Sequence, residues 1–162
     1  MSTMTTQTEQ LAAQFTAVND DAIAVVTHCT ADQWRLPCVD EGRLVGVVAH
    51  HIATVHRDFT GLLTALVAGQ TRSPGSSMAD VDESNARHAH DFAEVGQAET
   101  LDLLRTNGAA VVALLNRLDD AQLDRIAGVF GGNKLTVAQV VEWIVIGHAR
   151  VHLASIRATI GE

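Results

Sequence analysis

Several residue types that mark large classes of protein are scarce in this sequence. Only two of its 162 residues are cysteines, Cys29 and Cys38, which is too few for a disulfide framework or a four-sulfur zinc site. No apolar run reaches the roughly 18 residues that a membrane-spanning helix needs. The first ten residues, MSTMTTQTEQ, lack the basic start and the apolar stretch of a signal peptide, so we expect a cytoplasmic protein.

Positive charge is also in short supply. Lys and Arg number 11 against 19 Asp and Glu, which gives a formal net charge of −8. This balance argues against nucleic acid or an anionic membrane as the main partner, because both need a basic face. Proline occurs twice, tyrosine is absent and aromatic residues make up 4%, whereas apolar residues make up 47%. We therefore expect one domain, residues 1–162, with a core of aliphatic side chains.

The sequence does contain helical periodicity. Apolar residues recur at three- and four-residue steps, which places them on one face of a helix. The helices predicted on this basis span residues 5–29, 43–68, 79–118 and 136–159, the third bent or broken near Gly96. The last helix is apolar on more than one face, so we expect neighbours to cover most of its sides. Four amphipathic segments with short links predict an all-α, four-helix bundle.

Three segments rich in glycine, proline or small polar residues interrupt this pattern. Pro37 and Gly42 mark residues 32–42 as a loop, and residues 70–77 (QTRSPGSS) read as a flexible connection. Residues 128–134 (GVFGGNK) contain paired glycines, which stop a helix from propagating.

Three of the eight histidines fall on apolar stripes of predicted helices. His148 and His152 are four residues apart, so both imidazoles lie on one side of the last helix, and His51 lies on the apolar stripe of the second. Burying an unpaired polar ring costs on the order of 1–3 kcal/mol. The pattern therefore predicts either a shared divalent metal ion or histidines that each bond to a backbone carbonyl or a carboxylate.

A second histidine, His50, directly precedes His51 in the sequence. His50 and His51 are 100° apart on the helical wheel, so we expect only one of them to point inward. His51 is favoured, because His50 shares its side of the helix with Gly46, Ala53 and Arg57.

Three stretches of the chain resemble a known family. They are EGRLVGVVAHHIA in the second helix, DESNARHAHDFA in the third and GHARVHLASIRATI in the last. Together they resemble the DinB/YfiT-like superfamily, which includes the N-terminal domain of mycothiol-dependent maleylpyruvate isomerase. The resemblance covers nearly the whole chain, up to Ile160, and it implies a four-helix bundle.

The same resemblance implies a divalent metal ion, often zinc or nickel, held by three histidines. Matched position by position, the ligands are His51, His148 and His152, with His50 as the alternative register for the first. Arg43 departs from the family, in which a tryptophan commonly stands before the second helix. That difference affects the packing at the start of the helix rather than the ligands.

The function implied by the resemblance is chemistry on a small thiol. Characterised members use mycothiol, bacillithiol or glutathione, so the chain is expected to be a metal-dependent thiol S-transferase or isomerase in which a metal-bound thiolate attacks a small electrophile. Asn85 and His88 are the expected cofactor-binding residues, and residues 70–77 and 128–134 are expected to set substrate choice. The composition, rich in Ala, Val and Asp, makes mycothiol the first thiol to try, and a homodimer is expected. The alternatives are a non-catalytic metal-binding bundle with a stress-response or ligand-binding role, and a bundle whose histidines bind nothing.

The remaining polar residues receive supporting or local roles. Glu142 and Asp58 are candidate carboxylate partners for the metal-binding histidines. Cys29 is expected to be a buried free thiol, and Cys38, beside Pro37, an exposed and oxidisable one. The histidines assigned to surface or local polar roles are His28, His56 and His90.

Overall fold

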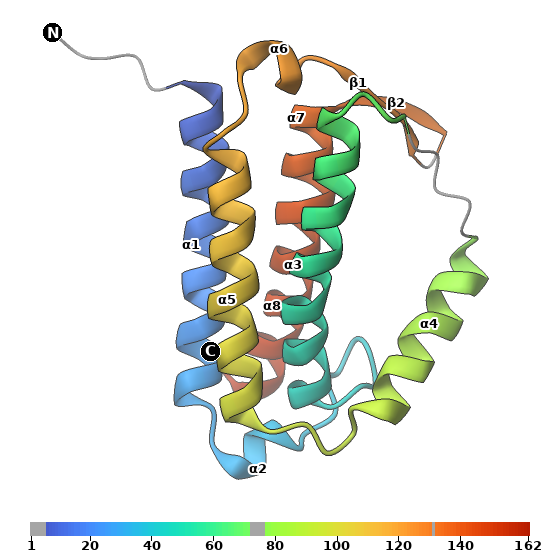
Figure 1. Cartoon of the computed structure of the whole chain (residues 1–162). Coiled ribbons are helices and arrows are strands. Elements are labelled where there is room, and N and C mark those ends of the chain that lie inside the picture. The colour runs from blue at the N-terminus through green and yellow to red at the C-terminus, as the bar shows by residue number, and fades with distance from the viewer. Residues whose placement is uncertain (1–5, 72–76, 131) are drawn as a thin grey trace, which may run out of the picture.

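Long helices make up most of the protein, as a computed structural model shows (Figure 1). The structure describes residues 6–71, 77–130 and 132–162. In chain order the elements are α1 (Gln7–His28), α2 (Ala31–Trp34), α3 (Val45–Val67), α4 (Met78–Asp91), α5 (Gln97–Leu115), α6 (Asp120–Leu123), β1 (Ile126–Phe130), β2 (Asn133–Thr136), α7 (Val137–Gln139), the π-helix η1 (Val140–Ile146) and α8 (Gly147–Ile160). The predicted all-α class is confirmed, with one small hairpin added to it.

The long helices pack into a closed ring around the core. α1 contacts α5 and α8, and α3 contacts the same two helices from the other side. The side chains that they bury completely are mainly aliphatic, as the composition predicts, and include Phe15, Ile52, Leu63, Leu104, Leu115, Ile146 and Ile156. Among the described residues, no helix combines the length and the apolarity that crossing a membrane requires.

Capping boxes fix where several helices begin. At the start of α1 the Thr6 hydroxyl accepts from the backbone N–H of Glu9, and the Glu9 carboxylate accepts from the N–H of Thr6. Thr136 and Gln139 repeat the arrangement at α7. Each box satisfies two backbone donors that would otherwise be unpaired at a helix N-terminus.

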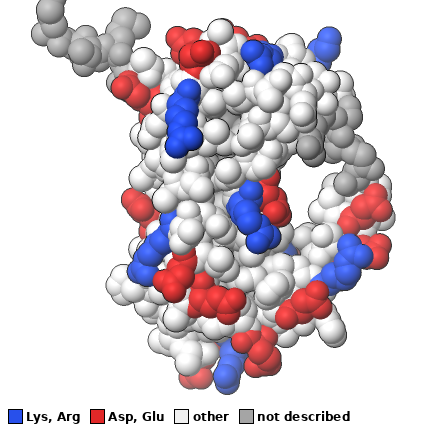
Figure 2. Space-filling view, viewed as in Figure 1, with Lys and Arg blue, Asp and Glu red and all other residues white. Residues whose placement is uncertain are grey.

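The predicted third helix is two helices. The chain breaks between α4 and α5, and Gly96 is the N-cap of α5, which confirms the predicted break. α5 joins the bundle, whereas α4 has no buried residues and stands beside α3, separated from the bundle over part of its length (Figure 2). The polar composition of α4 explains the difference, because it offers little apolar surface to bury.

The glycine-rich segment before the last helix forms a hairpin rather than a loop. β1 and β2 pair antiparallel, with Val129 opposite Lys134 and Gly128 opposite Leu135. The paired glycines do exclude helix, but the β-branched and aromatic residues just before them, Ile126, Val129 and Phe130, favour a strand. Residue 131 of the predicted segment 128–134, and residues 72–76 of the predicted connection 70–77, lie outside the described residues.

A polar layer crosses the bundle core. His56, expected at the surface or in a local polar role, is fully buried, and its Nε2 donates to Oδ1 of Asn19 at 3.2 Å. The Asn19 amide nitrogen donates in turn to the backbone carbonyl of Leu104. Of the two roles expected for His56, the surface position was therefore wrong. The side of α3 that carries His56 packs inside the bundle.

Candidate metal centre

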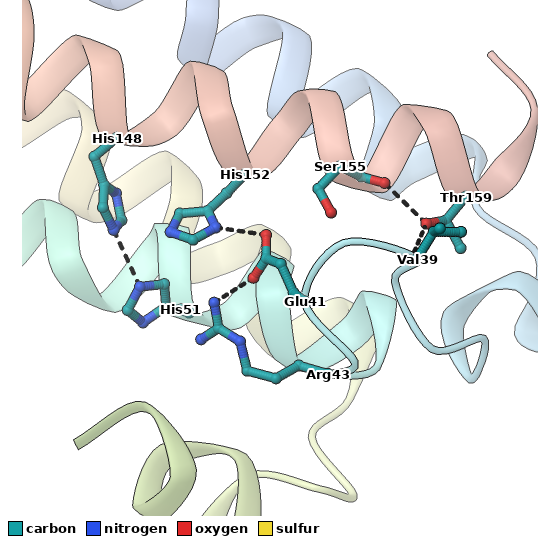
Figure 3. A network of polar contacts seen from close by, with 8 residues as sticks. All are labelled: Val39, Glu41, Arg43, His51, His148, His152, Ser155 and Thr159. Carbon is teal, nitrogen blue, oxygen red and sulfur yellow. Dashed lines mark hydrogen bonds and ion pairs between the residues drawn. The ribbon is translucent and has the colours of Figure 1, made fainter. Parts of the chain in front are cut away.

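Three imidazoles converge on one point between α3 and α8 (Figure 3). One ligating nitrogen from each of His51, His148 and His152 lies within 4.8 Å of the other two. Nε2 of His51 is 3.0 Å from Nε2 of His148. His148 and His152 are one turn apart on α8, and His51 faces them from the second turn of α3. The three histidines that the sequence analysis singled out therefore lie together.

The local structure just before these ligands is unusual. η1, a π-helix of seven residues, runs directly into α8 and places His148 in the first turn after it. A π-helix carries more residues per turn than an α-helix, so it rotates the faces of the segments that it joins. Trp143 and Val151 are 56% and 67% exposed, so one side of this helix faces solvent, whereas Val141, Val145 and Leu153 on its other sides are buried, as expected for most of its sides.

The electrostatics of the cluster favour a cation over protons. Burial, followed by the neighbouring histidines, lowers the pKa of His51 to about 2, and burial together with His152 lowers the pKa of His148 to about 3. Both rings are therefore neutral at pH 7 and each offers a lone pair. Nδ1 of His148 is buried with no hydrogen-bond partner among the described residues. Imidazole nitrogens are ligands that suit a divalent transition metal, so the three residues present fit such an ion.

A carboxylate that the sequence analysis did not select orients the cluster. Nδ1 of His152 donates to Oε1 of Glu41 at 2.7 Å, and the other Glu41 oxygen pairs with the Arg43 guanidinium. Burial raises the pKa of Glu41, but the hydrogen bonds and charges of His152 and Arg43 outweigh it and hold this pKa below its ordinary value. Glu41 is therefore ionised, and it leaves Nε2 of His152 free to face the other two rings.

The carboxylates that were predicted for this role lie elsewhere. Glu142 is exposed on η1, and Asp58 is exposed on α3, where it pairs with Arg57. The prediction of Glu142 and Asp58 as partners of the histidines was wrong. The signal in the sequence was the pair Glu41 and Arg43, two opposite charges immediately before a helix that carries the first ligand.

Two hollows open beside the cluster and share Val151 and His152. One, of about 550 Å³, lies between α4, α8 and the loop before α3, and its lining includes Asp40, Asp82 and Asn85. The other, of about 410 Å³, is lined by Trp143, Ile144, Gly147, His148, Val151 and His152. The cluster is therefore reachable from a polar side and from an apolar side.

The comparisons with known proteins agree with this architecture. The sequence profile described as the DinB superfamily matches residues 9–156. The chain belongs to the DinB superfamily. No curated protein and no solved structure is significantly similar to it. Superfamily membership and the histidine cluster together fit a metal-dependent protein.

A second histidine pair in this DinB-superfamily protein corrects the wheel-based interpretation of His50. His50 is 1% exposed, and its Nδ1 is 3.0 Å from Nε2 of His88 on α4. Phe92 packs against both rings. His50 and His51 thus both point away from solvent, because α4 covers a second side of α3. His50 does not join the metal-ligand cluster of the described residues, which contains His51.

Asn85 and His88, the expected cofactor-binding residues of this DinB-superfamily protein, lie beside the histidine cluster. Asn85 lines the polar cavity, and the His88 ring lies edge-on to His51, with ring centroids 5.4 Å apart. Their cofactor-binding role stays a prediction.

Cys38 was expected to be exposed, but the loop folds over it: it is buried, and burial raises the pKa of its thiol. Cys29 is buried and free, as predicted, and the residues exposed as predicted are His28 and His90.

Proposed function

We propose that the protein is a divalent-metal-dependent thiol S-transferase or isomerase, with His51, His148 and His152 as the metal ligands. The observation that carries the proposal is the convergence of three imidazoles within 4.8 Å, beside two separate hollows. A zinc or nickel ion bound there would supply a Lewis acid that lowers the pKa of a coordinated thiol toward neutrality. The thiol would then attack a small electrophile.

The residues around the cluster have the roles that this chemistry needs. Burial keeps His51 and His148 uncharged, so they act as ligands and not as acid–base groups. Glu41 fixes the ring of His152, and Arg43 balances the charge of Glu41. With three protein ligands, a tetrahedral ion has one position left for an exogenous group.

The two hollows suit two different substrates. The polar cavity, which contains Asn85, is suited to the carrier group of a low-molecular-weight thiol such as mycothiol, and His88 stands one turn further along α4. The apolar groove exposes Trp143 and Val151 next to His148 and is suited to an apolar electrophile. The two groups would meet at the cluster.

The test is thiol conjugation by purified, untagged protein loaded with zinc or nickel. Mycothiol, bacillithiol and glutathione are each offered with monochlorobimane, and the fluorescent thioether is measured. We expect metal-dependent turnover with at least one thiol, and its loss in His148→Ala but not in His90→Ala, which changes an exposed histidine of α4. Stoichiometric metal binding without turnover or saturable thiol binding would contradict the enzymatic proposal and favour a non-catalytic metal-binding role.

A further inference from the structure

The apolar groove beside His148 is formed by one continuous helical segment. All of the residues that line it come from η1 and the first turns of α8. Two of them, His148 and His152, belong to the candidate metal centre. A molecule that occupies the groove therefore lies against the histidine cluster. The volume of about 410 Å³ falls within the range of small-molecule sites.

The π-helix brings an aromatic side chain to this groove. The backbone N–H of Gly147 donates to the carbonyl of Glu142, five residues back. In an α-helix, residues five apart are separated by about 140° around the axis, whereas a turn that closes over five residues places them nearly one above the other. Trp143 and His148 are five residues apart and line the same groove. A regular α-helix would turn the indole of Trp143 away from the candidate ligand.

The wall of the groove contains a glycine that packing does not explain. Gly147 has ordinary helical backbone angles, φ −59° and ψ −42°, so alanine would fit the same conformation. Among the described residues, a Cβ at this position would meet only the Glu142 carbonyl, at the ordinary contact distance of 3.6 Å. At Gly108, by contrast, a Cβ would overlap Asn19. Glycine destabilises a helix relative to alanine, and at position 147 it leaves the space beside Trp143 open.

The groove exposes too little apolar surface for a protein partner. Trp143 and Val151 are the exposed large apolar side chains of η1 and α8, all of whose residues the structure describes. A stable protein interface buries roughly 800 Å² on each partner, which two side chains cannot supply. An indole does, however, present a flat apolar face on which a second ring packs favourably. A small planar molecule therefore fits the groove better than a macromolecule.

These observations define the class of the electrophile. We infer that the apolar groove selects an aromatic ring: the ring packs on Trp143, and Gly147 leaves the space that the ring occupies. Val151, which lines both hollows, stands between the ring and the polar cavity. The inference rests on the proposed function, because it names the kind of molecule that the thiol attacks. Trp143 is then a specificity-determining residue that touches the substrate.

The experiment compares two ligands that differ in the shape of one ring. Benzohydroxamate and cyclohexanecarbohydroxamate carry the same zinc-binding group, on a planar ring and on a puckered ring. Their binding to the zinc-loaded full-length chain is measured by calorimetry at pH 7. We expect the planar ligand to bind about fivefold more tightly to the wild type, as ring packing predicts. This ratio should persist in Trp143→Phe and fall to about one in Trp143→Leu, with the affinity for zinc unchanged in both.

A second variant fills the groove without removing the indole. Gly147→Ala should weaken the binding of benzohydroxamate several-fold, because the added methyl group takes the space of the ring. Its fold and its affinity for zinc should match those of the wild type. Gly61→Ala makes the same exchange at an exposed position of α3 with open space around it, and should keep the full affinity.

The outcomes separate the inference from the proposed function. Equal affinities for the two hydroxamates in the wild type, or a ratio that survives in Trp143→Leu, would overturn the inference and leave the proposed function standing. The variant Trp34→Phe leaves Trp143 as the single tryptophan. If quenching of its fluorescence by acrylamide weakened as the protein concentration rose, a second copy would cover the groove, which would also overturn the inference. A chain that binds no zinc, or binds zinc but neither hydroxamate, would overturn the proposed function and this inference with it.

Discussion

Glu41 is the side chain on which the orientation of His152 depends. Its carboxylate accepts from Nδ1 of His152 on α8 and pairs with Arg43, which lies with Glu41 in the loop before α3. An imidazole held through one nitrogen presents the other in a fixed direction, which lowers the entropic cost of binding an ion. Glu41 thus contributes to the candidate metal centre without being a ligand.

Replacing Glu41 by Gln should weaken metal binding while the fold persists. The amide of Gln cannot offer the same charge-assisted acceptor to His152, so we expect the affinity for zinc to fall about 10- to 100-fold. A competition titration against a chromophoric chelator measures the change. Glu142→Gln, at an exposed position of η1, is the matched control and should bind zinc as the wild type does. Equal affinities in the two variants would show that Glu41 has no part in the site.

The stability of the protein should depend on pH through the buried residue His56. Burial lowers the pKa of this residue to about 4, against an ordinary value of 6.5. Between these two values the unfolded chain binds a proton at His56 and the folded chain does not, so the free energy of unfolding falls as the pH is lowered through this range. From pH 7 to pH 5 the loss due to His56 is about 2 kcal/mol.

The variant His56→Gln isolates this contribution. Gln keeps an amide donor for the Asn19 oxygen but does not titrate. The unfolding free energy of the variant protein should therefore depend less steeply on pH than that of the wild type. The other buried histidines titrate in both proteins and cancel in the comparison. Urea unfolding at pH 7 and pH 5 should show a wild-type loss about 2 kcal/mol larger than that of the variant. Parallel pH profiles would mean that His56 is not held neutral by burial.

The contact between α1 and α5 depends on a missing side chain. Gly108 lies against the Asn19 amide, and a Cβ at position 108 would overlap it. Asn19 is also the partner of His56 and of the Leu104 carbonyl, so it cannot move without breaking the polar layer of the core. The glycine therefore sets how closely the two helices approach.

Gly108→Ala should destabilise the protein by about 1–3 kcal/mol, since the added methyl group forces the helices apart or displaces Asn19. Gly61, on an exposed side of α3, has open space around its Cα. Gly61→Ala should leave the stability unchanged or raise it by about 0.5–1 kcal/mol, because Ala favours a helix. Thermal and urea unfolding of both variants test the pair. A neutral Gly108→Ala would show that the helices tolerate a wider separation.

Elements with a clear apolar period could be predicted from the sequence, and those set by tertiary contacts could not. The bounds of α1 and α3 fall within two residues of prediction because their stripes are regular. The helical wheel placed His50 on an exposed side of α3, because a wheel assumes that only one face of the helix is covered. In the structure α4 covers a second face of α3. No periodicity indicates that a seven-residue π-helix precedes His148.

The same distinction applies within the candidate metal centre. His148 and His152 could be paired from their spacing alone, because a regular helix fixes their relation. Glu41 is 111 residues away from His152 along the chain and lies in an irregular loop, so only the folded structure brings them together. Local patterns thus singled out the histidines that cluster but not the carboxylate that orients one of them.

Taken as a whole, the molecule is an acidic helical scaffold whose clustered histidines lie between α3, α4 and α8. Acidic and basic side chains are interspersed on the face in Figure 2, with no broad basic patch there, in keeping with the net charge of −8. The candidate ligands come from α3 and α8, two helices that pack directly on each other. A metal ion bound by both would cross-link them.

Metal loading should therefore stabilise the entire fold. An ion that binds only the folded state adds about 2.7 kcal/mol when its free concentration is 100 times the dissociation constant. For a chain of this size we expect the melting temperature to rise by roughly 5–10 °C with zinc and to return on chelation. Calorimetric melting with zinc, with chelator and with magnesium measures the effect, and magnesium should cause none because it prefers oxygen ligands.

The most direct test is zinc stoichiometry by equilibrium dialysis of the untagged protein, with each histidine of interest replaced singly by Ala. The wild type should bind one zinc ion per chain. The ion should be lost from His51→Ala, His148→Ala and His152→Ala and kept by His50→Ala and His90→Ala, with circular dichroism confirming that each variant is folded. Wild-type protein that retains no zinc, or folded His51→Ala protein that still binds a full equivalent, would contradict the assignment of these three histidines as a metal site.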